Sequence, residues 1–364
     1  MERMPSTRIR HVGLRGREPP AGATDLQDGV RMRPLIPNLM ALIAGRRQAG
    51  QRASAKPVLS IVLVVYRMPE QAARTLHTLS PGYQRGVREQ DYEVIVVENE
   101  SDQPLGEAKA TSHAGNVRYF ARRETRASPV FAINFGASQA RGTHIAIMID
   151  GARMLTPGVV GLSLDAVRIA SHAAVAVPGY HIGHKLQQLA VEEGYDERSD
   201  AALLASIGWP ADGYRLHDIA TLSGSCRSGF FRPIAESNFL VCSRDKWSAL
   251  HGMDERYDNH GGGYANIDLY KRLLDLPETP LYLLFGEGTF HQFHGGVTTG
   301  HGGESFTRIF TAIQRQDAAI HGPDRALPAN EPILFGSAHP PVHRFIRHSI
   351  EAADLALETT APPV

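Results

Sequence analysis

The sequence predicts an α/β fold: a doubly wound, mostly parallel sheet flanked by helices, with an N-terminal arm and a C-terminal helical tail. Two observations favour this fold class. Residues 58–66 (VLSIVLVVY) form a β-branched run that is typical of a central parallel strand. Residues 70–79 follow with helical spacing of apolar side chains at Ala73, Leu76 and Leu79. Strands that alternate with helices in this way favour right-handed crossovers and an open sheet.

Further apolar runs predict the remaining strands. Residues 92–97, 117–121 and 145–149 are the next candidates, and a helix is expected over residues 130–140. Beyond about residue 156 the pattern loosens, because proline, glycine and tryptophan are interspersed. We still expect strands at residues 238–242 and 281–285 and a helix at residues 246–250.

The chain is expected to divide into three parts. Residues 1–55 are rich in Arg, Gly, Pro and Gln, and they predict a poorly ordered arm with one short docking helix near residues 39–43. Residues 56–304 form the predicted domain, with its best-patterned half at 56–155 and a looser half at 156–304. Residues 305–364 return to amphipathic spacing and predict a helical tail, interrupted by a proline-rich segment at 323–341.

Charge and cysteine content exclude several classes of partner. The chain has 38 Lys and Arg and 38 Asp and Glu, so no long-range attraction to nucleic acid is expected. Cys226 and Cys242 form no CxxC pair, which fits a reducing cytoplasm. No apolar stretch reaches the roughly 18 residues that a transmembrane helix needs. We therefore expect a cytoplasmic protein that reaches any lipid-linked substrate from the inner face of the membrane.

Polar side chains follow the predicted strands at the points where these end. Tyr66 ends the first strand, Glu98 and Asp102 follow the second in the sequence VENESD, and Asp150 follows the strand at 145–149. In open α/β sheets, ligands bind at the carboxyl ends of the strands. These side chains are therefore candidates for a binding site.

Four segments in a fixed order resemble the family 2 glycosyltransferases of the GT-A fold. They are the strand ending in Val65-Tyr66-Arg67, the VENESD segment, the helical segment AINFGASQARG, and the strand ending at Asp150. The resemblance covers roughly residues 57–300. It implies that residues 56–155 form a nucleotide-binding half and residues 156–304 an acceptor half.

Positions that match the family pattern are expected to bind a nucleotide-diphosphate sugar, most simply a UDP-sugar. The resemblance places Tyr66 beside the base, Glu98 where the family has an aspartate that contacts the base, and Asp102 near the ribose. The full set of expected donor-binding residues is Val65, Tyr66, Glu98, Asp102, Asn134, Gly136, Asp150, Gly151 and Arg153.

A divalent metal ion is the expected cofactor, with Asp150 as one ligand. The family's second aspartate falls on Ala152, so another ligand must come from elsewhere. The later segment GEGTFHQFHGG offers His291 and His294, which share one side of the chain only if a turn separates them. A site of carboxylate and imidazole suits Mn²⁺ better than Mg²⁺. Alternatively, Arg153 replaces part of the metal's charge, because a guanidinium matches phosphate geometry.

The catalytic base is left open by the sequence. Where the family has an acid pair before Asp-Leu, this chain has Ala265 and Asn266, and an amide cannot accept the proton. Asp268 or Glu236 takes that role, or the reaction retains configuration and needs no such base. The expected acceptor-side residues are Trp209, Gly262, Gly263 and Asn266.

The predicted activity is metal-assisted glycosyl transfer, with a hexose as the expected sugar. The acceptor is a polysaccharide, a glycolipid or a small molecule, and the chain is a possible homodimer. The alternative is a degenerate GT-A domain that binds a nucleotide sugar or a partner protein without turnover. A nucleotidyltransferase and a Rossmann dehydrogenase are disfavoured, because no glycine-rich loop follows the first strand.

Overall fold

The computed structural model describes residues 56–323, 325–326 and 328–360. The predicted docking helix near residues 39–43 lies outside these residues. The strands are β1 Leu59–Val65, β2 Tyr92–Asn99, β3 Val117–Arg122, β4 His144–Met148, β5 Arg153–Leu155, β6 Ala174–Ala176, β7 Gly179–Ile182, β8 Ala220–Leu222, β9 Leu240–Ser243, β10 Leu281–Phe285, β11 Thr289–His291 and β12 Ile333–Gly336. The helices are α2 Pro69–Leu79, α3 Glu107–Thr111, α4 Val130–Ser138, α5 Val159–Ile169, α6 Gln187–Ala190, α7 Glu197–Ser206, α8 Arg244–Ala249, α9 Ala265–Asp275, α10 Gly303–His321 and α11 His343–Thr360. Short 3₁₀ helices lie at Glu89–Asp91, Val191–Glu193, Gly213–Ile219, Gly224–Cys226, His260–Gly262 and Pro340–Val342.

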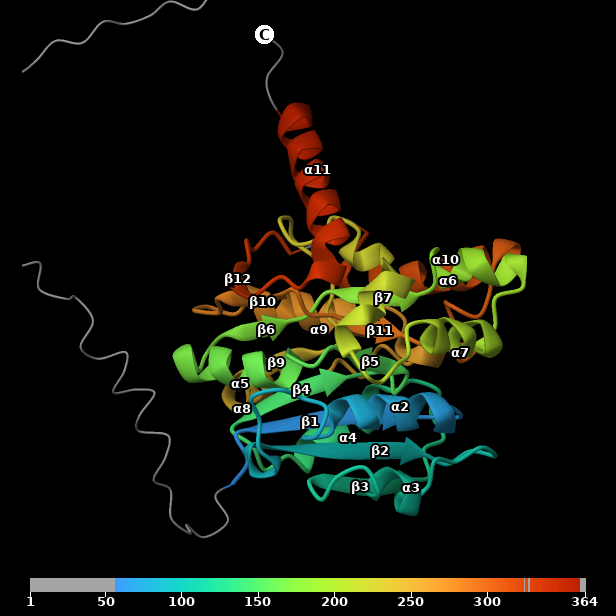
Figure 1. Cartoon of the computed structure of the whole chain (residues 1–364), viewed down its shortest axis with the longest axis vertical. Coiled ribbons are helices and arrows are strands. Elements are labelled where there is room, and N and C mark those ends of the chain that lie inside the picture. Colours follow the sequence, from blue (N-terminus) through green and yellow to red (C-terminus); the bar gives the residue numbers. More distant parts are fainter. Residues whose placement is uncertain (1–55, 324, 327, 361–364) are drawn as a thin grey trace, which may run out of the picture. The chain divides into compact units, whose positions relative to one another are not determined.

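The predicted fold class is confirmed by the main sheet, which has eight strands in the order β12-β10-β6-β9-β4-β1-β2-β3. All neighbours are parallel except β9, which runs antiparallel to both β4 and β6. Figure 1 shows the strands of this sheet stacked one above another, with α2 and α4 beside β1 and β2. The strands predicted at residues 58–66, 92–97, 117–121, 145–149, 238–242 and 281–285 correspond to β1, β2, β3, β4, β9 and β10.

The side chains of β1 alternate between two hydrophobic layers. Leu59, Ile61, Leu63 and Val65 pack in the layer that contains residues of α2 and α5. Val62 and Val64 pack in the layer that contains residues of α4 and α9. Every residue of β1 is buried, as expected for a strand covered by helices on both faces.

A second, smaller sheet has the strand order β5-β11-β7-β8. β11 pairs antiparallel with β5 and parallel with β7. The sequence did not predict this sheet, because its strands are only three or four residues long and leave no measurable alternation. Its first strand closely follows β4 in the chain, because β5 begins three residues after Asp150.

The predicted helical tail contains a strand as well as two helices. Helix α10 precedes it, and β12 then pairs in parallel with β10 at the edge of the main sheet. Helix α11 follows and extends away from the rest of the domain (Figure 1). The proline-rich segment predicted at residues 323–341 therefore includes the edge strand.

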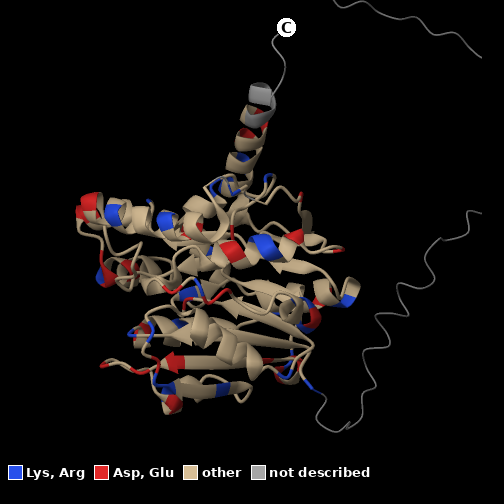
Figure 2. Cartoon of the chain, turned by 180° about the vertical axis from the view of Figure 1, so that it is seen from behind, with Lys and Arg blue, Asp and Glu red and all other residues tan. Residues whose placement is uncertain are grey.

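Charged residues are spread over the helices and loops, and the strands of the main sheet carry few of them, mostly on β2 and β3 (Figure 2). Lys and Arg are interspersed with Asp and Glu on this side of the domain. None of the described helices combines the length and the apolar character that crossing a membrane requires.

Candidate active site

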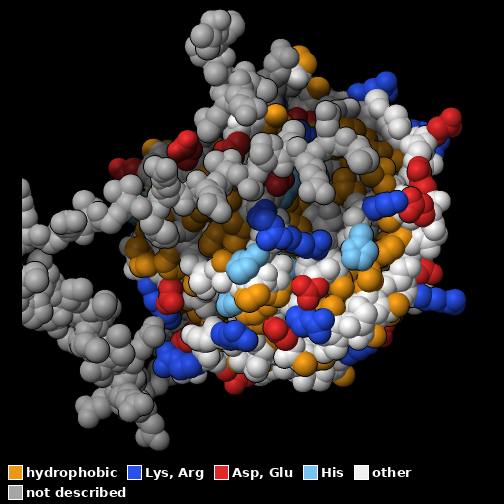
Figure 3. Space-filling view, turned by 45° about the horizontal axis from the view of Figure 1, so that its top comes forward, with side chains coloured by type: hydrophobic (Ala, Val, Ile, Leu, Met, Phe, Trp, Pro, Cys, Tyr) orange, Lys and Arg blue, Asp and Glu red, His pale blue; other side chains and the backbone are white. Residues whose placement is uncertain are grey.

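A cleft of about 750 Å³ lies at the carboxyl ends of β1 and β4. Tyr66 and Asp150, which follow these strands, both line it. On the face drawn in Figure 3, histidine, cationic and acidic side chains lie close together around a hollowed region. Of the sequence-predicted residues, the cleft brings together Tyr66, Asp150, Arg153, Glu236, Gly263, Asn266, His291 and His294.

Asp150, His291 and His294 form a compact cluster of potential metal ligands. Nε2 of His291 lies 2.9 Å from Oδ2 of Asp150, and Nε2 of His294 lies 3.6 Å from Oδ1. The two imidazole Nε2 atoms are 3.2 Å apart. Strand β11 ends at His291, so the chain leaves the extended conformation before His294 and both rings reach the same carboxylate. The turn that the odd spacing required is therefore present.

Gln187 at the start of α6 determines how the His291 ring is presented. Its side-chain nitrogen donates to the carbonyl of His291 at 3.1 Å, so its oxygen faces Nδ1 of the same residue at 2.6 Å. An amide oxygen can only accept, so Nδ1 carries the hydrogen and Nε2 faces Asp150 with its lone pair. Gln187 is fully buried and cannot exchange this partner for water.

The donor set of this cluster fits a divalent cation. Burial, followed by the charge of Arg153, lowers the pKa of His291 to about 4, so its imidazole is neutral at pH 7. Burial would raise the pKa of the Asp150 carboxyl, but His294 and His291 hold it well below its ordinary value. An ionised carboxylate and a neutral imidazole then face each other with lone pairs at hydrogen-bond distance. A cation between them satisfies both, and carboxylate and imidazole are common ligands of divalent metal ions.

Three strands of the second sheet place Arg153, His291 and His181 in one row. His291 on β11 is in register with Arg153 on β5 and with His181 on β7. Residues directly opposite each other on paired strands share a face of the sheet. Arg153 is 9% exposed, and its Nε lies 3.6 Å from Oδ2 of Asp150. The second sheet thus brings a guanidinium to the same carboxylate as the histidines.

The segment that carries the two histidines is held by buried hydrogen bonds. Asp200 on α7 accepts from the backbone nitrogen of Phe293 at 2.6 Å and also from the hydroxyl of Tyr195. The side chain of Gln292 donates to the carbonyl of Gln71 on α2 at 3.0 Å. Burial raises the pKa of Asp200 to about 6. These contacts fix His291 and His294 relative to both sheets.

Of the two candidate bases, Glu236 is the one that lines the cleft. Its Oε2 accepts a hydrogen bond from Nδ2 of Asn266 at 2.8 Å. Asn266 also donates to the carbonyl of Ser237 at 3.1 Å, which orients the amide so that its nitrogen faces Glu236. The asparagine at the family's acid position therefore positions a carboxylate from another segment.

Asp268 is fully buried in an ion-pair network on α9. Arg325 and Arg272 donate to its two oxygens at 2.8 and 2.7 Å, and His321 lies 3.0 Å away. Two guanidinium groups compensate its charge, so the carboxylate is already engaged in holding α9 to the tail. These ion pairs give Asp268 a structural role in the fold.

Glu98 is likewise engaged in local structure. Its carboxylate accepts hydrogen bonds from the backbone nitrogens of Leu105 at 2.6 Å and Gly106 at 2.9 Å, and from the Tyr119 hydroxyl at 2.6 Å. These bonds close the loop that follows β2. The neighbouring residues Asn99 and Glu100 line the cleft instead.

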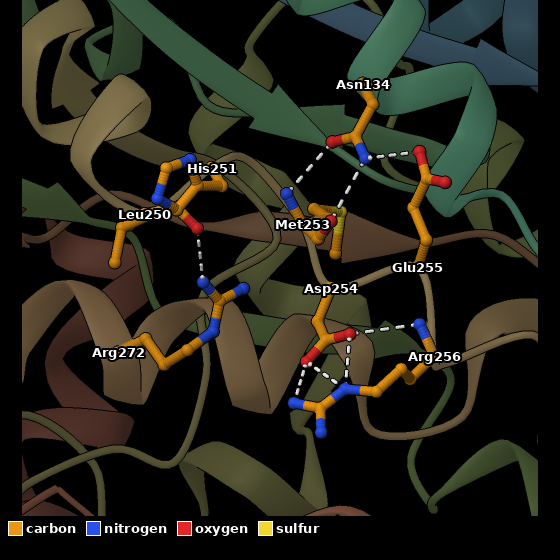
Figure 4. A pocket seen from close by; sticks show the side chains of 8 residues that line it. All are labelled: Asn134, Leu250, His251, Met253, Asp254, Glu255, Arg256 and Arg272. Atoms are coloured by element: carbon orange, nitrogen blue, oxygen red, sulfur yellow. Dashed lines mark hydrogen bonds and ion pairs between the residues drawn. The ribbon is translucent and has the colours of Figure 1, made fainter.

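Asn134 lines a different, smaller pocket of about 360 Å³ (Figure 4). Its side chain exchanges hydrogen bonds with the backbone of Met253 and donates to Glu255. Gly136, two residues further along α4, allows that helix to approach β1. A Cβ there would lie 2.4 Å from Cγ1 of Val62.

The remaining predicted residues lie outside the group that lines the cleft. Asp102 is exposed and pairs with Arg67 at 3.1 Å. Trp209 packs edge-on against His77, with ring centroids 5.3 Å apart. Val65 is buried in the core, a Cβ on Gly151 would come within 2.7 Å of the Val64 carbonyl, and Gly262 packs on Pro129.

Sequence reasoning missed several residues of this site. Gln187 and His181 belong to no recognisable sequence motif, because they lie beyond residue 156, where the spacing of apolar residues is irregular. Arg126 lines the cleft from the loop before α4, and His260 lines it from the start of the 3₁₀ helix before α9. A basic residue in a loop is usually solvated, so sequence alone offered no signal for either.

Residues 60–160 match the family model described as Glycosyl transferase family 2. The match begins in β1, ends in α5 and includes Asp150 and Arg153, which confirms the predicted resemblance over these residues. The matched segment, which covers less than a third of the chain, is similar to the family 2 glycosyltransferases. No curated protein matches the chain significantly.

Several solved structures are similar to this one. TarS from S. aureus is 11% identical, with a TM-score of 0.45, and the match covers 72% of this chain and 40% of that chain. TarS 1-349 in complex with UDP-GlcNAc is 10% identical with a TM-score of 0.47, covering 72% and 67% of the two chains. The mannosyltransferase PcManGT from Pyrobaculum calidifontis, in complex with GDP-Man and Mn²⁺, is 14% identical with a TM-score of 0.42, covering 90% and 83%. The chain thus spans less than half the length of the first of these proteins.

Proposed function

We propose that this chain is a glycosyltransferase that moves a hexose from a nucleotide-diphosphate sugar to a hydroxyl of a sugar or lipid-linked acceptor. The proposal rests on the Asp150–His291–His294 cluster, which lies in a large cleft. Its carboxylate, Asp150, follows a strand of the family-matched segment. A UDP-sugar is the proposed donor, and the cytoplasmic side of a membrane is the proposed place of work.

The Asp150 cluster is proposed to bind the cation that accompanies the donor diphosphate, with Mn²⁺ preferred over Mg²⁺. When bound, this ion supplies positive charge to the leaving diphosphate as the bond to the sugar C1 breaks. Gln187 orients the His291 ring for this purpose. Arg153 provides a second positive charge on the same side of the cleft. Tyr66 is the proposed contact for the nucleotide base, since it is 43% exposed at the end of β1.

Glu236 is the proposed general base. An acceptor hydroxyl that attacks the sugar C1 must lose its proton, and a positioned carboxylate can accept it. Asn266 holds the Glu236 carboxylate by one oxygen and leaves the other oxygen for the acceptor. A base in this position corresponds to a single displacement, so the proposed outcome is inversion at C1. Gly263 and Asn266 are proposed to lie on the acceptor side.

The first test is removal of the metal site. Asp150→Ala, or chelation of metal with EDTA in the wild-type chain, should lower donor turnover by on the order of a hundredfold or more. Turnover of each nucleotide sugar in a panel should be measured as the release of nucleoside diphosphate. Asp165→Ala, which removes an exposed carboxylate of α5, is the matched control. Full activity of the Asp150→Ala variant would rule the proposal out.

The second test concerns the base. Glu236→Gln keeps the side-chain shape but cannot accept a proton, so turnover should fall by roughly 10²–10⁴-fold while nucleotide affinity is retained. Proton NMR of the product should show inversion at C1 in the wild type. Glu278→Gln, at an exposed position, is the control. Undiminished turnover by Glu236→Gln would exclude this role, and tight donor binding without any product in the wild type would favour the non-catalytic alternative.

A further inference from the structure

Arg153 is a buried cation with an incomplete set of partners. Its Nε and Nη1 are shielded from solvent, and neither has a hydrogen-bond partner within the described part of the chain. Asp150, with its Oδ2 3.6 Å from Nε, is the single carboxylate that the described residues place in ion-pair range of this guanidinium. Buried guanidinium groups normally have their hydrogen-bonding groups satisfied. Arg153 therefore has unused capacity to bind an anion.

Asp150 faces two competing demands. It is the nearest counter-charge for Arg153, and it is also the one carboxylate in the cluster with His291 and His294. A single negative charge cannot neutralise a guanidinium and a divalent cation together. Arg153 also lies directly opposite His291 on the paired strands β5 and β11, so its charge is close to the imidazole as well as to Asp150. A cation that enters this cluster alone therefore meets electrostatic repulsion from Arg153.

We propose that Arg153 makes cation binding at Asp150 dependent on the donor diphosphate. This inference rests on the proposed function. It adds that the protein binds the cation alone more weakly than it binds the cation together with the diphosphate. A dication, Asp150 and Arg153 together carry two net positive charges, which matches the two negative charges of a nucleoside diphosphate that bears a sugar. The guanidinium binds phosphate oxygens through its planar fork of N–H groups. Arg153 thus disfavours the cation alone and favours the cation–diphosphate pair.

This role predicts opposite effects on two affinities from one substitution. Removing the charge of Arg153 should raise the affinity for the cation alone, because the repulsion is gone. The same change should lower the affinity for the diphosphate, because a phosphate-binding group is lost. Since coupling between two ligands is reciprocal, the factor by which nucleotide strengthens cation binding should also shrink. A purely structural role for Arg153 would weaken both affinities together.

The experiment measures Mn²⁺ binding by electron paramagnetic resonance of the free ion, and UDP and GDP binding by calorimetry, on the full chain. In the wild type, the nucleotide that binds more tightly should raise Mn²⁺ affinity by on the order of tenfold. Arg153→Met should bind Mn²⁺ alone more tightly than the wild type, and its nucleotide affinity should fall by on the order of tenfold. Arg153→Met removes no hydrogen bond of Nε or Nη1, so the fold should persist.

Two variants serve as controls. Arg153→Lys keeps the positive charge without the planar fork, so it should retain weak binding of Mn²⁺ alone. Arg168→Met removes an exposed arginine of α5 and should leave both affinities at the wild-type values. The inference is overturned if Arg153→Met binds Mn²⁺ alone no more tightly than the wild type, or if its nucleotide affinity is unchanged.

A third variant separates this inference from the proposed function. Asp150→Asn should abolish Mn²⁺ binding whatever Arg153 does. If Asp150→Asn loses the ion while Arg153→Met behaves as the wild type, the metal site stands and only the role of Arg153 is wrong. If Asp150→Asn binds Mn²⁺ as the wild type does, the proposed metal site and the inference both fail.

Discussion

Gln187 is the residue on which the orientation of His291 depends. It accepts the Nδ1 hydrogen of His291 and donates to the carbonyl of the same residue. Gln187→Leu removes both bonds, so Mn²⁺ affinity in the presence of nucleotide should fall by about 10–100-fold. Gln187→Glu keeps an acceptor for the Nδ1 hydrogen and should retain most of that affinity. Electron paramagnetic resonance of free Mn²⁺ measures both.

A matched control for this prediction is Gln139→Leu at the end of α4, where the glutamine side chain donates a hydrogen bond to Ser138 and lies outside the cleft. Thermal unfolding should show that Gln187→Leu and Gln187→Glu are both folded at the temperature of the binding measurement. Equal Mn²⁺ affinity in Gln187→Leu and the wild type would show that the ring orientation is set by other contacts.

Single residues of the cleft could be predicted where the residue type suits metal binding and the residue lies at the end of a strand. Asp150 follows a buried strand, and His291 lies in a glycine-rich segment that ends another; both line the cleft. Asp268 and Glu98 matched family positions, yet each carboxylate is engaged by other groups: Arg325 and Arg272 in one case, backbone nitrogens in the other. Arg272 lies one helical turn from Asp268, but Arg325 is distant in the chain, and the loop that turns backbone nitrogens toward Glu98 has no sequence motif.

At the scale of elements, Asp200 on α7 links that helix to the segment after β11. Its pKa is raised from 3.8 to about 6, mainly by burial. The folded state therefore holds this proton more tightly than the unfolded chain does. The resulting stabilisation is fully present below about pH 4 and is lost as pH rises through 6, a change of roughly two pKa units or about 3 kcal/mol.

Asp200→Asn should remove this contribution to the pH dependence. Between pH 4 and pH 7 the free energy of unfolding of the wild type should fall relative to that of the variant by about 2 kcal/mol. Urea denaturation at several pH values measures the difference. Asp165→Asn, at an exposed position on α5, should follow the wild type. Parallel curves for Asp200→Asn and the wild type would contradict the assignment.

Element prediction succeeded where strands are long and covered on both faces. β1, β2 and β4 are predominantly apolar and fully buried, and the structure contains all three. The second sheet was missed because three-residue strands such as β5 and β11 are too short for any periodicity. β12 was missed because its segment is proline-rich and its side chains are mostly exposed. Such strands exist because a neighbouring strand pairs with them, which is a tertiary effect.

At the scale of the whole molecule, the C-terminal helix supports the sheet that carries the histidines. Phe345 on α11 is 6% exposed, and its ring centroid lies 4.9 Å from that of Tyr180 on β7. Phe345→Ala should lower the free energy of unfolding by about 3–5 kcal/mol, because it leaves a cavity beneath this sheet. Chemical denaturation measures the loss.

The same helix supplies the control. Leu355 is 63% exposed, so Leu355→Ala should change the free energy of unfolding by no more than about 0.5 kcal/mol. If Phe345→Ala were as stable as Leu355→Ala, the N-terminal part of α11 would be an appendage of the domain. The prediction of a helical tail in this region would then describe a separate unit.

The boundary of the family match falls within the active site. Asp150 and Arg153 belong to the matched residues 60–160, whereas Gln187, His291 and His294 lie beyond them. The two groups meet through the pairing of β5 with β11 and through the direct contacts of both imidazoles with Asp150. The imidazoles of the proposed metal site can therefore change during evolution without affecting the segment that matches the family model. Relatives that share the matched segment need not share a metal.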